Sequence, residues 1–459
     1  MHMNKRKGRF YIGVAVFMAI VVAVFAVLYV LGDKQRNVAV EELKARASEV
    51  KARYQQRTKK IPIPETDIAP DSAEAADTAS LSGDSVEAYN KFSEKQIVID
   101  ARQTLELLFE NNKFKSAQEI DEELAAFCAD NQEFIVELRN IAATGGPFYE
   151  LDFSKILKSE LLPHRKDVRR WVQVLEKNGA MAVANGDYEE ATKDALAIAG
   201  FAEGIGKEPF MISQEIFGRL ENRFYALIAH NIQGGNLSPE QAARIIEYAA
   251  RFSGRNDLAD AIALESIWII KEIFEGIREV RGEPANSFVP RIYGSIGRPL
   301  LNRDEAIYAD VMERLSTIAS LPYHEARPEL ERIQKEVENI SYIRIIASVV
   351  LPQLVPGFCS MQEACARYEA QSGLMQIGLT VEQYHAQHGE YPQTLEEIAP
   401  ALGGTLPVDP YTGQNYVYKP GSNDFTLYSA RGRIVPPDEN RTARGCDAQG
   451  NIVWRNKST

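Results

Sequence analysis

An uninterrupted apolar stretch near the start of the chain constrains its fold more than any other feature. Residues 10–32 read FYIGVAVFMAIVVAVFAVLYVLG, 23 residues without a charged side chain. A helix rises about 1.5 Å per residue, so this stretch can cross a hydrocarbon core of roughly 30 Å. The alternative is a cleaved signal peptide, whose apolar region is shorter and ends in small residues of the A-x-A kind. This stretch ends in LYVLG instead, so we predict an uncleaved, single-pass anchor.

The charges on either side of this stretch favour one orientation. Residues 1–9 contain four lysines and arginines and no acidic residue, whereas the cations after the stretch are mixed with Asp33, Glu41 and Glu42. Positive charges close to a span stay on the cytoplasmic side. We therefore expect a cytoplasmic tail at 1–9, an anchor at 10–32 in the inner membrane, and C-terminal domains outside the cytoplasm.

Two patterns near the anchor would allow two copies to associate. Small residues recur at every fourth position of the apolar stretch, namely Ala15, Ala19 and Ala23, which lets two helices approach closely. An apolar seam with alternating spacings of three and four then runs through a helical stalk that we place at 33–60. Its members are Val40, Leu43, Ala47, Val50 and Tyr54. The seam is shorter than the repeats that identify a coiled coil, so a homodimer through anchor and stalk competes with a solvated single helix.

Charge is distributed unevenly along the 459 residues. Residues 1–60 hold 13 lysines and arginines against 4 acidic residues, whereas the whole chain has a net charge of -12. Phosphate backbones require clustered cations, so the acidic remainder argues against nucleic acid as a partner. A chain of this length with 45% hydrophobic residues exceeds one compact core, which predicts two or three domains.

The composition changes twice before the C-terminal region. Residues 61–90 combine three prolines with repeated alanine, serine and aspartate. They offer too little apolar area to offset the entropy of ordering, so we interpret them as a flexible acidic linker. Residues 91–358 have helical period almost throughout, which predicts an all-helical domain. Within it, Ser238, Pro239 and Gln241 are typical of a helix start with a capping box.

One segment of this domain has the pattern of two helices joined by a tight turn. A helix of small residues that starts near Trp171 meets the sequence NGDY, in which Gly186 permits a tight turn, and a second helix follows at once. Ala182, Ala184 and Ala191 would allow the two helices to pack closely, and the segment resembles a single tetratricopeptide-type helical hairpin. No second copy follows at a spacing of about 34 residues, which predicts one hairpin inside an irregular bundle. The resemblance implies a surface that binds peptides or proteins, with a purely structural role as the alternative.

From residue 359 to 459 the pattern becomes that of a small α+β domain. One helix with an apolar stripe is predicted at 360–387, and a glycine and a proline end it. A short helix follows at 394–398. Three strand candidates come next, at 415–419, 424–430 and 451–455. Turn residues join the first two strands into a hairpin.

Residues 359–459 contain an ordered series of motifs, whose positions are Tyr384, Gly389, Tyr391, Pro392, Pro407, Asp409, Pro410, Tyr411, Gly413, Tyr428 and Ser429. These motifs resemble the C-terminal half of the major pseudopilins of type II secretion and of related type IV pilin-like proteins. The resemblance implies a helix packed on a three-stranded antiparallel sheet, with aromatic side chains covering the helix. Asp409 would accept turn amides and Gly413 would adopt a positive φ. We call residues 359–459 the pilin-like module.

Two departures limit what the resemblance implies. The cleavage site that begins the assembly helix of a pseudopilin is missing, because Gly8 is followed by Arg9 and the apolar stretch contains no glutamate. We therefore do not expect the chain to polymerise as a pilus subunit. Calcium-binding members of the family have a glycine-rich loop with an aspartate after the serine, where this chain places two arginines. Asp438, Asp447 and Asn451 remain as weak calcium candidates, with a turn-rich connector as the alternative.

A search for chemistry yields no catalytic motif, and we predict no catalytic residues and no cofactor. His385 and His388 can share a helix face, but no cysteine lies at the spacing of a standard zinc module. If the pilin-like module lies outside the cytoplasm, Cys446 would form a disulfide with Cys359 or Cys365.

These observations predict a membrane-anchored bacterial envelope protein that acts through protein–protein interaction in a type II secretion or pilus-like system. The expected fold is mainly α, with a small α+β domain at the C-terminus. One alternative is an extracytoplasmic enzyme with a carboxylate or histidine site in the helical domain, and the other is a structural spacer. A convergent polar pocket with raised carboxyl pKa values would favour the enzyme.

Overall fold

The structure is a computed structural model, and it describes the chain in nine stretches. These are residues 36–54, 85–110, 115–149, 164–232, 237–252, 257–275, 298–339, 347–430 and 452–454. The predicted tail and anchor at 1–32 lie outside the described residues, as does most of the predicted linker. None of the helices in these nine stretches is long and apolar enough to cross a membrane.

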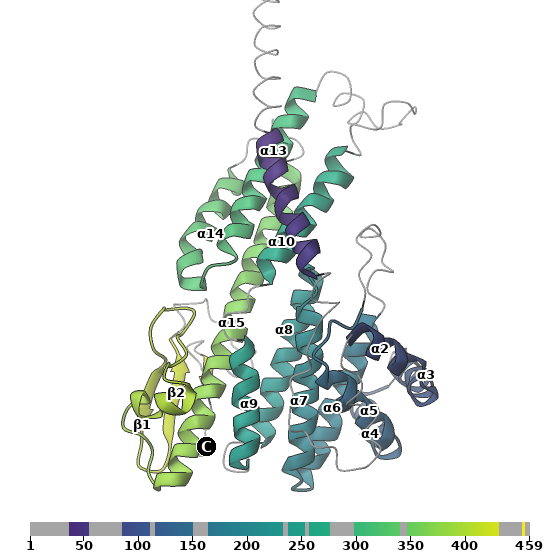
Figure 1. Cartoon of the computed structure of the whole chain (residues 1–459), viewed down its shortest axis with the longest axis vertical. Helices are drawn as coiled ribbons and strands as arrows, with labels where there is room; N and C mark the ends of the chain where they lie inside the picture. Colours follow the sequence, from purple (N-terminus) through teal and green to yellow (C-terminus); the bar gives the residue numbers. More distant parts are fainter. Residues whose placement is uncertain are drawn as a thin grey trace, which may run out of the picture. The chain divides into compact units, whose positions relative to one another are not determined.

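The described residues are mainly helical, with a small antiparallel sheet near the C-terminus, which confirms the fold class at that level (Figure 1). The chain divides into two compact units. The first combines Met1–Val50, Ala259–Ser320 and Pro328–Ser360, and the second combines Lys51–Leu258, Leu321–Arg327 and Met361–Thr459. The units do not follow the boundary predicted near residue 358, because the second unit takes in most of the helical region together with the pilin-like module.

In the first unit, the helix at residues 36–50 packs on helix α13 (Arg298–Ile318). Arg36 forms an ion pair with Glu305 at 2.7 Å, and Arg46 donates to a carbonyl near the end of α13 at 3.2 Å. The seam residues of this helix are 0 to 3% exposed. The helix is thus part of the unit and not a free stalk, and its seam offers no exposed face to a second copy.

The other described elements of the first unit are helical. They include α10 (Leu258–Ile269), the π-helix η7 (Ile270–Glu275), α14 (Tyr323–Glu338) and the first part of α15 (Ala347–His388). Residues at the ends of these elements belong to the second unit, so α14 and α15 each contribute to both.

The second unit begins with a bundle of helices. In chain order they are α2 (Ser85–Glu94), α3 (Gln96–Glu110), α4 (Ala117–Asp130), α5 (Gln132–Ala143), α6 (His164–Ala184), α7 (Tyr188–Gly206), α8 (Met211–Ala226), η5 (Leu227–Ile232) and α9 (Pro239–Phe252). Helix α2 extends into the predicted linker, since it begins at Ser85. The Ser85 hydroxyl donates to the carbonyl of Pro147 at 2.8 Å, and Tyr89 is buried, so tertiary contacts order a segment whose composition predicts flexibility.

Two local features of these helices, the capping box of α9 and the turn before α7, are present as the sequence predicts. At α9, the Ser238 amide donates to Gln241 Oε1 at 2.7 Å and the Gln241 amide donates to Ser238 Oγ at 3.2 Å, which confirms the capping box. Between α6 and α7, Gly186 has a φ of +77°, and Asp187 Oδ1 accepts the amide of Glu190 at 3.1 Å. The tight turn predicted at Gly186 is therefore present.

Helix α15 is longer than the sequence predicts. It begins at Ala347, well before the predicted start at 360, and contains two prolines. Each proline removes a helical hydrogen bond and favours a break. Leu351 and Val355 are completely buried here. Tertiary packing of this part of the helix therefore outweighs the local cost of the prolines.

The sheet of the pilin-like module is antiparallel, with strand order β1-β2-β3. β1 (Val417–Pro420) and β2 (Phe425–Ser429) form the predicted hairpin, and β3 (Ile452–Trp454) pairs with the other edge of β2. The strands lie at the predicted positions and are shorter. Before the sheet, the 3₁₀ helix η8 (Leu395–Leu402) occupies the position of the predicted short helix.

One apolar core runs through the second unit. It includes Trp171 and Phe201 from the helical bundle, Leu374 from α15, and Tyr416 and Trp454 from the pilin-like module. Burial of large side chains from both parts in one core stabilises them as one body. The pilin-like module is therefore an integral part of the second unit and not a separate domain joined to it by a linker.

Candidate functional site

Residues 407–413, which include five of the positions that carry the pilin-like resemblance, form a hydrogen-bonded turn between η8 and β1 that we call the signature turn. Asp409 is buried, its Oδ1 accepts the amide of Tyr411 at 3.0 Å, and its carbonyl accepts the amide of Gly413 at 2.8 Å. Gly413 has a φ of +68°, and a Cβ at this position would lie 2.6 Å from the ring of His324. Both local predictions, amide acceptance by Asp409 and a positive φ at Gly413, are confirmed.

A second contact of Asp409 connects this turn to the sheet. The hydroxyl of Ser429 on β2 donates to Asp409 Oδ2 at 2.9 Å, and Ser429 is completely buried. Burial raises the pKa of the Asp409 carboxyl, and the donors from Tyr411 and Ser429 oppose that rise. The carboxyl is thus a structural acceptor that holds the turn on the strand, with no face open to a metal or substrate.

Aromatic side chains of the module cover one side of α15. The hydroxyl end of Tyr416 lies against Gly373, where any Cβ would overlap it. A Cβ at Gly378 would lie 2.6 Å from the indole ring of Trp454. Two glycines on the helix therefore allow two large aromatic residues to approach its backbone.

The opposite side of α15 is covered by the helical bundle. The ring of Tyr368 lies against Gly218 of α8, where a Cβ would overlap the ring. The hydroxyl of Ser372 donates to the carbonyl of Ala249 on α9 at 2.7 Å. In Figure 1 the second half of α15 accordingly lies between the sheet and the helices α8 and α9. Both sides of this helix are occupied by the chain itself.

The histidines at the end of α15 do not converge. His385 stacks on Tyr391 with ring centroids 4.2 Å apart, and His388 stacks on Tyr384 at 4.0 Å. Gly389, with a φ of +77°, ends the helix as predicted. Within the nine described stretches, no three histidine, cysteine or acidic side chains are placed to hold a metal ion.

The remaining candidates from the sequence lie partly outside the described residues. Cys128, Cys359 and Cys365 carry free thiols, whereas Cys446 is in a part of the chain that the structure does not describe, so both disulfide pairings stay predictions. The calcium candidates Asp438, Asp447 and Asn451 are also in that part. Burial raises the pKa of the Cys128 thiol to about 12, which makes it a poor nucleophile.

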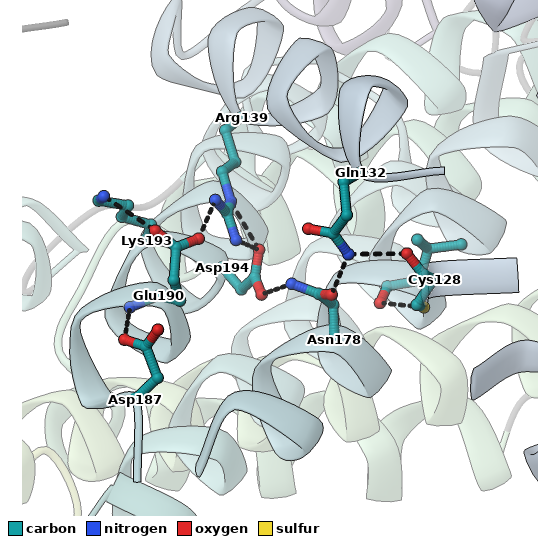
Figure 2. A network of polar contacts seen from close by, with 9 residues as sticks. Cys128, Gln132, Arg139, Asn178, Asp187, Glu190, Lys193 and Asp194 are labelled. Atoms are coloured by element: carbon teal, nitrogen blue, oxygen red, sulfur yellow. Dashed lines mark hydrogen bonds and ion pairs between the residues drawn. The ribbon is translucent and has the colours of Figure 1, made fainter. Parts of the chain in front are cut away.

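A buried polar network holds the predicted helical hairpin against α5 (Figure 2). Arg139 of α5 forms ion pairs with Asp194 at 2.7 Å and with Glu190 at 2.5 Å, both on α7. Asn178 of α6 donates to Asp194 Oδ2 at 2.7 Å, and Gln132 donates to Asn178 Oδ1 at 3.0 Å. Burial raises the pKa of Asp194 to about 6, and the Arg139 guanidinium opposes that rise. The sequence offers no signal for this network, because its members are spread over three helices.

A second buried cluster contains the residue types of a catalytic triad. His164 Nε2 lies 2.5 Å from Glu208 Oε1, and the Ser213 hydroxyl donates to Glu208 Oε2 at 2.5 Å. The carboxylate therefore lies between the histidine and the serine. Activation of a serine requires the imidazole next to the hydroxyl, so this order does not generate a nucleophile. Arg165 also donates to the Ser213 hydroxyl at 2.9 Å, and the cluster joins the start of α6 to α8.

A cavity of about 50 Å³ lies within the second unit, where α8 meets the second half of α15. Its described lining residues also come from the end of α7 and from the segments around Asp257 and Tyr323. Three of them are carboxylates, on Glu221, Asp257 and Glu369. Sequence reasoning missed this site, because its residues come from five separate segments and form no motif.

Comparisons with known proteins found no match, so the interpretation depends on this geometry. No family model, no curated protein and no solved structure matches the chain. The resemblance to pilin-like proteins therefore depends on the residues quoted above and on the arrangement of the turn, the helix and the sheet.

Proposed function

We propose that this protein is a single-pass envelope protein that binds other proteins in a type II secretion or pilus-like system. In this proposal, residues 10–32 anchor the chain in the inner membrane, and both compact units lie outside the cytoplasm. The pilin-like module serves as a fixed recognition element and does not act as a filament subunit. The proposal is supported by the apolar stretch and the ordered pilin-like motifs of the sequence.

One observation supports the non-filament role more than any other. The second half of α15 has the sheet against Gly373 and Gly378 on one side and the bundle against Tyr368 and Ser372 on the other. A pilin-like helix that packed against neighbouring subunits would need one of these sides free. Removing the bundle from Tyr368 would expose a large buried aromatic residue, which is unfavourable in water. The surfaces left for a partner are those of the signature turn and the outer parts of the module.

The polar clusters of the second unit favour binding over catalysis. Burial raises the pKa of the carboxyl groups of Asp167, Asp194 and Asp409, but these lie in separate networks that connect helices or strands. An enzyme of the carboxylate type would bring such groups together in one pocket. We therefore rank the enzymatic alternative second to the binding function.

The membrane placement is tested by protease accessibility in intact cells and spheroplasts. An epitope placed after Thr459 should survive protease treatment of intact cells and disappear when the outer membrane is opened. A cytoplasmic protein in the same sample should stay intact under both conditions. An epitope that is digested only after the inner membrane is lysed would place the module in the cytoplasm and refute the proposed orientation.

Partner binding is tested by site-specific photo-crosslinking in the same cells. A crosslinking residue at Val408, which is 50% exposed on the signature turn, should give a discrete adduct with another envelope protein. The matched control is Leu107 on α3, which is 65% exposed and lies outside the module. Equal adducts from both positions, or none from Val408, would contradict recognition through the module.

A further inference from the structure

We propose that the first unit lies directly on the bilayer and that one end of it contacts phospholipid headgroups. This end is formed by the start of the helix at residues 36–50 together with the first turns of α13. The inference rests on the proposed function, because it takes residues 10–32 as the membrane anchor. It adds a second membrane contact, made by folded residues, in place of the free stalk predicted at 33–60.

The covalent chain keeps the start of this helix close to the bilayer. Three residues, 33–35, separate the apolar stretch from Arg36, where the described helix begins. Even a fully extended chain spans at most about 14 Å from Gly32 to Arg36, since each residue covers about 3.3–3.6 Å. The headgroup layer is itself about 5–8 Å thick on each side of the hydrocarbon core. Arg36 is therefore within about 10 Å of the outer edge of the headgroups.

Arg36 is fixed to the body of the first unit, so this short connection places the whole unit. Its Nε forms an ion pair with Glu305 Oε2 of α13 at 2.7 Å, and the Glu305 side chain is completely buried. Separating the two side chains would leave a buried carboxylate without this cation, which is costly. The helix cannot leave the unit cheaply, and the unit must stay where the helix begins.

Two contacts show that the helix at 36–50 and α13 run parallel. Arg36 pairs with Glu305, and further along both helices Arg46 donates to the carbonyl of Ser316 at 3.2 Å. Helix α13 begins at Arg298, seven residues before Glu305. Its first turns therefore extend about 10 Å beyond the level of Arg36, on the side from which the anchor enters. This distance is similar to the length of chain between Arg36 and the apolar stretch, which brings the start of α13 to the headgroup layer.

The exposed side chains at this end suit a layer of phospholipid headgroups. Val38 is 55% exposed on the first turn of the helix, and Arg303 is exposed near the start of α13. An apolar side chain can enter the boundary between headgroups and acyl chains, and a guanidinium pairs with a lipid phosphate. The first acidic residues of the helix, Glu41 and Glu42, come about 7 Å further from the bilayer. The cationic and apolar groups thus precede the acidic ones.

A protein partner is a poorer occupant of this end. The apolar seam of the same helix is buried in the unit itself, with Val40 and Leu43 at most 2% exposed. A stable protein interface requires a much larger apolar area than Val38 provides. The bilayer, in contrast, is attached through a connection of three residues, so its effective concentration is high and weak contacts are sufficient.

The test uses the full chain in nanodiscs of phosphatidylethanolamine and phosphatidylglycerol. A diazirine-bearing residue is placed at one position at a time, and lipid adducts are measured by mass spectrometry after irradiation. Val38 and Arg303 should each give lipid adducts. The matched controls, Ser48 and Ser320, are also exposed in the first unit. Ser48 lies about 15 Å further along the helix of Val38, and Ser320, just after α13, lies about 25 Å beyond Arg303.

The two controls should give at least about tenfold fewer lipid adducts, because the headgroup layer is only about 5–8 Å thick. A diazirine-bearing residue at Val22, inside the apolar stretch, distinguishes this inference from the proposed anchor. Adducts at Val22 with none at Val38 or none at Arg303 would overturn the inference and leave the anchor in place. Equal yields at the controls would do the same.

A lack of lipid adducts at Val22 would refute the anchor and, with it, both proposals. Thermal melts by circular dichroism show whether each variant folds. If the variant at Val38 does not fold, Asn37 replaces it, since Asn37 is also exposed on the first turn of the helix.

Discussion

The ring of Tyr368 on α15 lies against the backbone of Gly218 on α8, at a position where no Cβ fits between them. This contact joins the helix of the pilin-like module to the helical bundle, and both elements also contribute side chains to one apolar core. The contact is one reason why the module is part of the second unit. It also provides the most direct test of that arrangement.

Replacing Gly218 with alanine should destabilise the protein by about 1–3 kcal/mol, because the added methyl group forces Tyr368 or the helix backbone to move. Gly357→Ala is the matched control, since this glycine also lies inside a helix but has no atom within 4 Å of the position that a Cβ would take. Alanine in that open position should stabilise the protein by about 0.5–1 kcal/mol. Urea unfolding followed by circular dichroism gives both values, and an equal effect of the two changes would show that α8 and α15 do not approach so closely.

Removing the Ser429 hydroxyl should weaken the attachment of the signature turn to β2. Ser429→Ala deprives a buried Asp409 carboxyl of one of its donors, which costs about 1.5–3 kcal/mol for a hydrogen bond to a charged group. Ser422→Ala, in the exposed turn before β2, should change the unfolding free energy by less than about 0.5 kcal/mol. If Ser429→Ala is as stable as the Ser422 control, the turn is not held through this hydroxyl.

The raised pKa of the Asp194 carboxyl should make the stability of the folded protein depend on pH, with a sign that follows from the direction of the shift. Its pKa in the folded chain is about 6, above the ordinary value of 3.8, because of burial. The folded state therefore binds the proton more tightly, unfolding releases it between about pH 4 and 6, and stability falls as the pH rises through that window. Above about pH 7 this contribution no longer changes.

The measurement compares the wild type with Asp194→Asn in urea unfolding at several pH values. The free-energy difference between the two should change by about 2 kcal/mol from pH 4 to pH 7, since one pKa unit corresponds to about 1.4 kcal/mol. Glu190, whose pKa is lowered in the same network, is present in both proteins and contributes to both profiles. Parallel pH profiles for the two proteins would contradict the raised pKa of Asp194.

The predicted disulfide can be counted directly by mass spectrometry. Alkylation of the unfolded chain without a reductant should label two of the four cysteines if Cys446 is bridged to Cys359 or Cys365, and all four after reduction. Cys359→Ser and Cys365→Ser distinguish the two pairings, because only the change at the true partner frees Cys446. Four labelled thiols before reduction would exclude both pairings.

Short-range features of this fold could be predicted because their causes lie within a few residues. The capping box of Ser238 and Gln241, the tight turn at Gly186 and the acceptance of a turn amide by Asp409 each join positions two or three apart or need one residue type. Backbone hydrogen-bond demand and steric restriction act at that range. The strand positions followed for the same reason, since alternation and turn composition are local patterns.

The amino-acid sequence alone thus determined the helical fold class, the small antiparallel sheet, the turn chemistry and the apolar stretch that we interpret as an anchor. Only the tertiary structure decided that the seam of Leu43 and Val50 is buried, that α15 continues through two prolines, and that Tyr368 lies against Gly218. The cavity lined by Glu221, Asp257 and Glu369 is also a feature that only the tertiary structure decided. Each of these features joins residues far apart in the chain, and the burial that stabilises them depends on which surfaces meet and not on any periodic pattern.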